Sequence, residues 1–407
     1  MGAAAREWPT IVVARQPMER PMKRNDLSRS LVAFEQNSTL VAVIELSLKS
    51  WLICGLVPGL TRQPLKKQAS DETLLLKLLY RWRDEAIKAG SRIERIAVAF
   101  EAGRDGFWLA RWLRARGIEA YVIHPNSVPV SREHRRAKSD RLDTALLMRA
   151  FLGWLREEAK HCSMAAIPSL AEEDARRPNR EHEHLVGERT SIVNRMKAAM
   201  VRLGVRGFNV KLRKAAERLA ELGTAEGEPL PANTLAELRR DMARLELVRE
   251  QIAAIEKQRL GRLRQAPREG AHPMILLLAR IMGIGVETAD MLVHEVLSRH
   301  LRDERALGRY VGLTGAPDES GSKRREKGLA KAGNARVRRG MIQLAWRWLM
   351  FQKDSALAKW FMARTAHPAR GVRKKMIVAL ARKLLIALWR YVTAGEVPAG
   401  AKLRPAV

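Results

Sequence analysis

The sequence predicts an α/β protein, with a mixed β-sheet covered by helices in its N-terminal part and a mostly helical C-terminal part. Three observations carry this prediction. Two β-branched runs, VAVIELS and WLICGLV, are separated only by a short LKS stretch, which is typical of a hairpin. After them, apolar runs of strand length alternate with amphipathic stretches of helix length. From about residue 185 onward, after a polar stretch, helical periodicity replaces this alternation.

The N-terminal elements follow one another closely. Residues 1 to about 38 are predicted to form a basic, poorly ordered extension, and a first domain is predicted over residues 39–162. Its first long helix has Ser70 or Asp71 as its N-cap. A later helix is expected to begin after Ser139, which also suits a cap. The other predicted strands are RIAVAFE and EAYVIHP, and the predicted helices are DETLLLKLLYRWRDEAIKAG, GFWLARWLRARG and SDRLDTALLMRAFLGWL.

The second part of the chain is expected to be helical. Residues from about 163 to 190 are polar and contain proline, so a linker or irregular excursion is predicted there, with helices over 185–203 and 234–266. The second helix keeps apolar residues at three- and four-residue spacing, which favours a coiled-coil-like arm, although an ordinary helical hairpin fits equally well. We therefore expect a linker and arm over residues 163–268 and a mostly α-helical, basic C-terminal domain over residues 269–407.

The composition indicates a nucleic-acid partner. Lys and Arg number 75 against 44 Asp and Glu, so the net charge is +31, and polyphosphate backbones are the usual reason for such an excess. An anionic membrane surface is less favoured because the basic residues are spread over the whole length. The two cysteines, Cys54 and Cys162, exclude a disulfide framework and a thiolate zinc site. No run is long and apolar enough for a signal peptide or a membrane span, so we expect a cytoplasmic protein associated with the bacterial nucleoid.

Four acidic residues mark a candidate metal site. Glu45 lies in the run VAVIELS with apolar neighbours on both faces, so an ionised side chain there is costly unless it is compensated. Glu101 ends the strand IAVAFE. Asp140 and Asp143 lie three residues apart, on one face of a helix near its N-terminus. Taken singly, each also fits a structural role: a buried Glu–Arg pair, a solvent-facing strand end, or acids that suit the helix dipole.

The order of these acids is more informative than any one of them. An acid on the first strand, an acid at a later strand end and a helix-borne pair together form the arrangement by which a ribonuclease-H-like sheet gathers carboxylates. Two divalent ions about 4 Å apart can then activate a nucleophile and stabilise a leaving oxygen. Mg²⁺, or Mn²⁺, is therefore the expected cofactor. The EHEH stretch at 181–184 is interpreted as solvated, because a polar linker gives metal ligands no fixed geometry.

A serine-containing loop forms the second candidate site. Residues 312–346 read GLTGAPDESGSKRREKGLAKAGNARVRRGMIQLAW, with Ser320 and Ser322 flanking Gly321 at the tip of an expected irregular loop. Cations around a hydroxyl would stabilise a phosphate and favour the alkoxide. From spacing alone, a loop that only binds phosphate remains the alternative. The surrounding cations are Lys323, Arg324, Arg325, Lys327, Lys331, Arg336, Arg338 and Arg339.

A glycine-containing turn precedes this loop. In LLLARIMGIGVETADMLVHEV, Gly283 and Gly285 are expected to join two helices. Glycines in such a turn let backbone N–H groups approach a phosphate, so the pattern resembles a helix-hairpin-helix that binds the DNA backbone. A plain helix corner explains the same pattern.

Together these segments resemble the insertion-sequence one-ten family of transposases, the DEDD recombinases of bacterial mobile elements. The resemblance covers nearly the whole chain. It is carried by AFEAGRDGFWLARWLRARGIEAYVIHP, HRRAKSDRLDTALL, MGIGVETADMLV and GLTGAPDESGSKRREKGLAKAGNARVRR. It implies a RuvC-like, RNase-H-fold catalytic domain, a helical arm and a C-terminal transposase domain with a nucleophilic serine. It also implies a covalent phosphoserine link to DNA and a structured non-coding bridge RNA that selects the target and donor DNA.

Residue by residue, the resemblance assigns the four acids to Glu45, Glu101, Asp140 and Asp143. It assigns the nucleophile to Ser320, because the family's serine directly precedes a glycine. The family's first acid is usually Asp, whereas this chain has Glu45, which is one methylene longer and still offers oxygen ligands to Mg²⁺.

We therefore expect a metal-dependent, RNA-guided DNA transposase that works as a homo-oligomer, a dimer or tetramer, because acids and serine belong to different predicted domains. A RuvC-like nuclease that hydrolyses branched DNA, and a catalytically dead nucleic-acid-binding protein, are the alternatives.

Overall fold

The computed structural model describes residues 30, 32–101, 103, 106–128, 140–158, 161–210, 212, 214–299, 301–320, 323–329, 332–366 and 372–405, with the backbone alone at 126, 140, 316–320 and 323–327. The described chain divides into two compact units, the first ending at Glu172 and the second beginning at Glu173. Each unit is a body of its own and is described separately.

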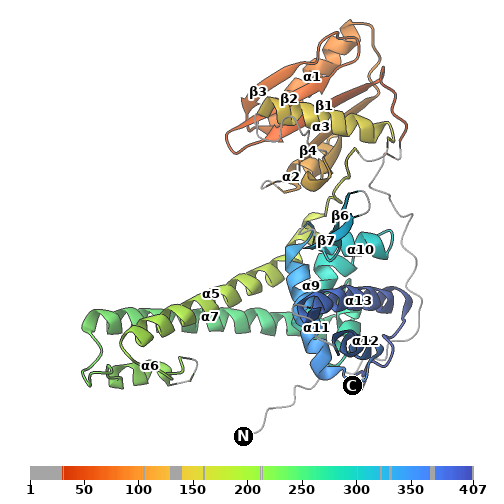
Figure 1. Ribbon diagram of the computed structural model, residues 1–407. Helices are drawn as coiled ribbons and strands as arrows, with labels where there is room; N and C mark the ends of the chain where they lie inside the picture. Colours follow the sequence, from red (N-terminus) through yellow and green to blue (C-terminus); the bar gives the residue numbers. More distant parts are fainter. Residues whose placement is uncertain are drawn as a thin grey trace. The chain divides into compact units, whose positions relative to one another are not determined.

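The first unit contains a five-stranded mixed sheet in the order β3-β2-β1-β4-β5 (Figure 1). Strand β2 runs antiparallel to both β1 and β3, whereas β4 runs parallel to both β1 and β5. The mixed sheet expected from the sequence is therefore confirmed. Strand β3, LKKQA, was not predicted, because it is polar and largely exposed and so has no apolar alternation. The strands are β1 (Thr39–Leu46), β2 (Ser50–Leu56), β3 (Leu65–Ala69), β4 (Arg95–Glu101) and β5 (Glu119–Ile123).

Three helices cover the two faces of this sheet. On β1, Leu40, Ala42 and Ile44 pack with α1 and α2 in one core cluster. The alternate residues Val41 and Val43 pack with α3 in another, because successive side chains of a strand point to opposite faces. Of the two expected caps of α1, Ser70 and Asp71, the structure uses Asp71, which accepts hydrogen bonds from the backbone N–H groups of Thr73 and Leu74. The helices are α1 (Glu72–Lys88), α2 (Trp108–Arg114) and α3 (Asp140–Leu155).

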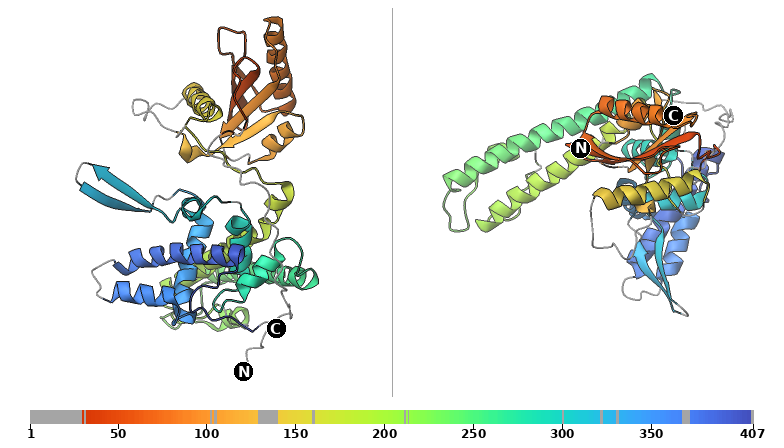
Figure 2. Two further views of the ribbon diagram at one scale, coloured as in Figure 1. Left: turned by 90° about the vertical axis from the view of Figure 1, so that its right-hand side faces the viewer. Right: turned by 90° about the horizontal axis from the view of Figure 1, so that it is seen from above.

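In the second unit, two long helices, α5 (Arg177–Arg202) and α7 (Ala232–Gln265), lie side by side and form the arm (Figures 1 and 2). Buried apolar residues of both helices, including Met196 and Leu245, form their shared core. Asp241 of α7 is buried between them and pairs with Arg195 of α5. Short elements join the two helices: α6 (Ala215–Arg218) and the 3-10 turn η2 (Leu219–Glu221).

The expectation of an irregular excursion up to residue 190 was wrong from Leu170 onward. Helix α4 (Leu170–Asp174) and then α5 occupy this stretch, and Pro178 lies in the first turn of α5, where a proline costs no helical hydrogen bond. The stretch is polar because many of its side chains pair with other charged groups and few are buried among apolar residues. His182 Nε2, within EHEH, lies 3.1 Å from Glu256 Oε1 on α7.

The rest of the second unit is mostly helical, as expected, with one two-stranded hairpin. Strands β6 and β7 form this hairpin where an irregular loop was predicted, and it extends away from the helices (Figure 2). The elements are α8 (His272–Ala279), α9 (Val286–Leu292), the π-helical segment η3 (Val293–Leu297), α10 (Glu304–Val311), β6 (Gly315–Ser320), β7 (Lys323–Leu329), α11 (Ala335–Phe351), α12 (Ala356–Thr365) and α13 (Val372–Ala394). No helix in the described ranges is long and apolar enough to cross a membrane.

The last described residues form a strap over the turn between α8 and α9. The backbone N–H of Met282 donates to the Lys402 carbonyl at 3.0 Å, and Ile281 forms a β-bridge with Leu403. Arg404 Nη1 donates to the Ala279 carbonyl at 2.6 Å and to the Ile284 carbonyl at 3.4 Å. The strap therefore fixes the main chain on both sides of Gly283.

Candidate active site

Glu45 and Glu101 lie at the same end of two parallel strands. The pairing of β1 with β4 runs from Thr39 opposite Arg95 to Ile44 opposite Phe100, so the next residue on each strand is one of these glutamates. Val43 and Ala99, two residues before Glu45 and Glu101, pack under α3. Because alternate residues of a strand share a face, both glutamates belong to the α3 face of the sheet. Both are half-buried.

Helix α3 brings the acidic pair to this same end. Its last turn lies near the chain that enters β1, since the Ser30 N–H donates to the Trp154 carbonyl and Arg156 bonds Gln36. Helix α3 packs on β1, β2 and β4, and since its last turn lies near the start of β1, its first turn is directed toward the end where β1 and β4 finish. Asp143 is half-buried there, one turn before the buried Leu147. Asp140 begins the helix, and Ser139, its expected cap, lies outside the described residues.

The donor set at this end consists of carboxylate oxygens, which suit hard cations such as Mg²⁺ or Mn²⁺ and not thiolate-seeking metals. Among the described side chains, no three His, Cys, Asp or Glu residues group closely enough to hold a metal ion. The side chain of Asp140 is outside that comparison. The structure thus places Glu45 and Glu101 at the ends of neighbouring strands, and among the described side chains it shows no closed ligand cluster that includes Asp143.

Ser320 is the last residue of β6 and pairs with Lys323 across the hairpin. Of the predicted cations, four lie on β7, namely Lys323, Arg324, Arg325 and Lys327, while Lys331 falls outside the described residues, as does Ser322. The base of the hairpin is closely packed. Gly312, which ends α10 with a φ of 72°, has no room for a Cβ, because that atom would collide with the Ala332 carbonyl.

The three predicted arginines of α11 make contacts within the chain. Arg338 Nη1 donates to the Ala332 carbonyl at 2.8 Å and so closes the hairpin base. Arg336 forms ion pairs with Glu183 and Glu295. Arg339 also pairs with Glu183, yet its side chain is 63% exposed. Arg339 is thus the one of these three whose side chain is mostly open to solvent.

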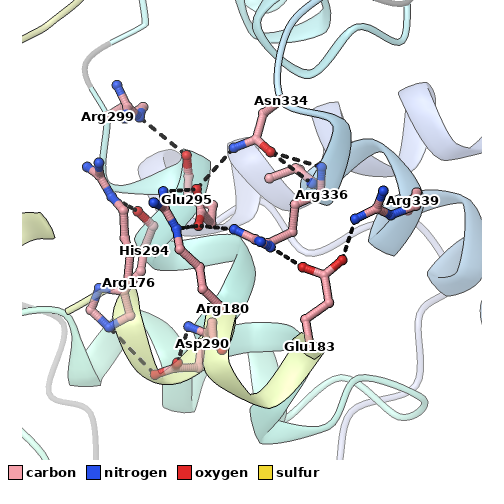
Figure 3. Close-up of polar contacts among 12 residues, drawn as sticks. Arg176, Arg180, Glu183, Asp290, His294, Glu295, Arg299, Asn334, Arg336 and Arg339 are labelled. Carbon is pink, nitrogen blue, oxygen red and sulfur yellow. Dashed lines mark hydrogen bonds and ion pairs between the residues drawn. The ribbon is translucent and has the colours of Figure 1, made fainter. Parts of the chain in front are cut away.

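A buried charged network, absent from the sequence-based expectations, lies beside the hairpin (Figure 3). Glu295 on η3 has a side chain only 2% exposed and accepts hydrogen bonds from Arg180 of α5 and Asn334, the N-cap of α11. Burial by itself raises the pKa of Glu295, but the hydrogen bond and charge of Arg180, together with Asn334 and Arg336, outweigh it and hold that pKa below its usual value. The sequence offered one signal by which Glu295 could have been found: it is a glutamate inside the apolar run MLVHEVL, just as Glu45 lies inside VAVIELS.

The glycine turn joins two helices, α8 and α9, as expected. Gly283 adopts a φ of 92°. A Cβ there would lie 3.0 Å from the Cβ of Phe351, so the turn also packs closely on α11. In the described part of the chain, the backbone N–H groups of Gly283 and Gly285 donate to no carbonyl or side chain.

Comparison with known proteins places these features in a family. The profile of the transposase family IS116/IS110/IS902 matches residues 276–360, which include the glycine turn and the serine hairpin. The protein y4rJ of Sinorhizobium fredii, whose name assigns it provisionally to the transposases, is 42% identical over 371 residues, covering 89% of this chain and 93% of that protein. The chain belongs to this transposase family. The resemblance drawn from the sequence is confirmed, and the protein is a transposase of insertion sequences, which acts in DNA recombination.

Proposed function

We propose that this transposase cuts and rejoins DNA through a phosphoserine intermediate, with Ser320 as the nucleophile. Glu45, Glu101, Asp140 and Asp143 would hold Mg²⁺ or Mn²⁺. The observation that carries the proposal is the neighbouring position of Glu45 and Glu101 at the ends of β1 and β4, with the first turn of α3 at the same end.

We also propose that the first unit is RNase-H-like, and specifically RuvC-like. Its strand order supports this assignment: a parallel β1-β4-β5 core is extended by the antiparallel strands β2 and β3. Carboxylates at the carboxyl ends of the parallel strands fit the general rule that sites form there in α/β sheets.

The chemistry of the chain's own residues follows from this proposal. The Ser320 hydroxyl loses its proton and forms a bond to the scissile phosphorus, while the leaving DNA oxygen departs and gains a proton. A hydroxyl of the incoming strand then attacks the phosphoserine, and Ser320 regains its proton. One ester bond is exchanged for another at each step, so no external energy source is required. A bound divalent ion would supply positive charge that stabilises the transferring phosphate.

DNA and a structured bridge RNA are the proposed partners, and a homo-oligomer, a dimer or tetramer, is the proposed working form. The net charge of +31 supports nucleic-acid binding along much of the molecule. The basic strand β7, with Lys323, Arg324 and Arg325 directly after the hairpin tip, supports contact with the phosphate that Ser320 attacks.

A trapped protein–DNA adduct tests the proposal. The full chain, with any RNA that co-purifies, is incubated with Mg²⁺ and a labelled duplex carrying the element's end, then denatured and separated by size. We expect an adduct with the wild type and with Ser322→Ala, and none with Ser320→Ala or Glu101→Gln. Cleaved DNA without an adduct would instead support hydrolysis by a nuclease. A protein that binds DNA but neither cleaves it nor forms an adduct would be a catalytically dead binder.

A further inference from the structure

Glu295 joins three segments of the second unit that are far apart in the sequence (Figure 3). Its Oε2 accepts a hydrogen bond from Asn334 Nδ2 at 3.0 Å, and its Oε1 accepts one from Arg180 Nε at 3.0 Å. Arg336 Nη1 lies 3.4 Å from the same Oε1. One buried carboxylate thus contacts the arm helix α5 and the start of α11.

Asn334 fixes the path of the chain as it leaves the serine hairpin. Its Oδ1 accepts from the backbone N–H groups of Arg336 and Val337 and so caps α11. Its own backbone N–H donates to the Tyr310 carbonyl at 2.7 Å. The side-chain NH₂ group is left to reach Glu295, so one residue bonds α10, α11 and η3.

The chain that enters the hairpin is held by the same glutamate. Tyr310 lies near the end of α10, two residues before Gly312, and its hydroxyl donates to the Glu295 carbonyl at 3.3 Å. Arg299 Nε donates to that carbonyl as well, at 3.2 Å. Carbonyls in the last turn of a helix lack helical partners, so these two side chains satisfy the group. Residues before and after the hairpin, Tyr310 and Asn334, therefore both bond Glu295.

Packing alone does not explain this buried charged network, because burying it costs desolvation free energy. A buried carboxylate costs several kcal/mol of desolvation unless ionic partners offset it, and apolar residues of similar volume often stabilise a core at least as well. Directional bonds add what apolar contacts lack, a defined orientation of the groups they join. Glu295 also lies on a π-helical segment, a distortion that occurs frequently at functional sites.

We infer that Glu295 is a positioning residue for the transposition reaction: through Asn334 and Tyr310 it sets the direction in which the hairpin with Ser320 projects, and through Arg180 it ties that direction to the arm. This inference rests on the proposed role of Ser320. Glu295 itself takes no part in the transfer of the phosphate.

A reversal of one hydrogen bond tests the inference. Asn334→Asp keeps an oxygen that caps α11 but places a second carboxylate against Glu295. The double variant Glu295→Gln/Asn334→Asp restores the bond with its direction reversed, because the introduced amide donates to the introduced carboxylate. Glu304→Gln is the matched control, since Glu304 is a surface residue of α10 that pairs with Arg390 outside the network.

Two readouts are measured on the full chain, the rate of adduct formation at saturating DNA and the hydrogen exchange of the peptide 315–334. For Asn334→Asp we expect the adduct rate to fall by about tenfold to a hundredfold, as for small misplacements of reacting groups. We also expect faster exchange in the peptide, with the DNA affinity and melting temperature close to those of the wild type. The double variant should recover most of the adduct rate and most of the slow exchange, and the control Glu304→Gln should match the wild type in both readouts.

The outcomes separate this inference from the proposed function. If the wild type forms no adduct, or Ser320→Ala forms as much, the proposed function fails and the exchange data alone decide on the positioning of the hairpin. Unchanged exchange in Asn334→Asp overturns the inference. So does a fall of the melting temperature that accounts for the whole loss of rate, or a double variant that recovers neither readout.

Discussion

Glu45 and Glu101 are neighbours on adjacent parallel strands, one residue beyond the last paired positions of β1 and β4. Two carboxylates at this spacing repel each other, and a shared divalent cation removes that repulsion. If the pair holds a divalent cation, as proposed, metal binding adds to the stability of the first unit whether or not DNA is present.

Mg²⁺ is expected to stabilise the wild-type protein, and this effect should vanish in Glu45→Gln and Glu101→Gln. At about ten times its dissociation constant, a ligand of the folded state adds about 1.4 kcal/mol to the free energy of unfolding. For a unit of this size that corresponds to about 2–4 °C per kcal/mol in melting temperature, measured by differential scanning calorimetry with and without Mg²⁺. Glu94→Gln, at an exposed glutamate paired with Arg92, should keep the full shift. Equal shifts in all variants would contradict the assigned ligands.

The arm should lose stability in acid. The hydrogen bond from Arg195 holds the pKa of Asp241, whose side chain is 1% exposed, below its usual value. A lowered folded pKa means that the stabilisation is present above the unfolded value of about 3.9 and is lost as the pH falls through the folded one. Asp241→Asn should cost about 1–3 kcal/mol at neutral pH and less at low pH. Hydrogen exchange of α5 and α7 peptides measures both, and a cost that did not shrink in acid would refute the ionic account.

Two leucines of α7 should differ sharply in their response to truncation. Leu245 is fully buried against α5, whereas Leu247 is 55% exposed. Leu245→Ala should reduce the free energy of unfolding by about 2–5 kcal/mol through lost burial and a cavity. Leu247→Ala should change it by no more than about 0.5 kcal/mol. Urea unfolding followed by circular dichroism compares the two, and similar losses would show that the arm does not pack as described.

Alanine substitutions at two glycines, Gly312 and Gly328, distinguish the cost of backbone strain from the cost of a steric clash. Gly312 and Gly328 both have positive φ angles, 72° and 89°, so alanine carries about 1–2 kcal/mol of strain at either position. A Cβ at Gly312 would also collide with the Ala332 carbonyl, whereas one at Gly328 would meet no atom within 4 Å. Gly312→Ala should therefore lower the melting temperature well beyond Gly328→Ala. Matching melting curves would show that the hairpin base can relax.

Local signals predicted the first unit well. Asp71 was one of two expected caps, because a cap needs only the N–H groups that follow it, and β1, β2 and β4 are apolar runs that are visible in the sequence. Strand β3 is not such a run, because its side chains are largely exposed. The hairpin of β6 and β7 was missed for a related reason, since its sequence reads as a polar loop.

The sites show the same division between local and long-range information. Glu45 and Glu101 were chosen as candidates because a carboxylate in an apolar strand is conspicuous, and the parallel register places their backbone positions side by side. The partners of Glu295 could not be predicted, because Arg180 and Asn334 come from 115 residues before it and 39 residues after it. Only the fold brings these three residues into contact.

The strap of residues 402–404 affects when the glycine turn can complete its folding. The N–H of Met282 and the carbonyls of Ala279 and Ile284 find these partners more than a hundred positions later in the chain. The glycine turn thus reaches its final form only after residues 402–404 have been synthesised. A mobile element whose reading frame is interrupted between the turn and residue 402 would still encode Gly283 and Gly285, but the turn would lack the residues that secure it.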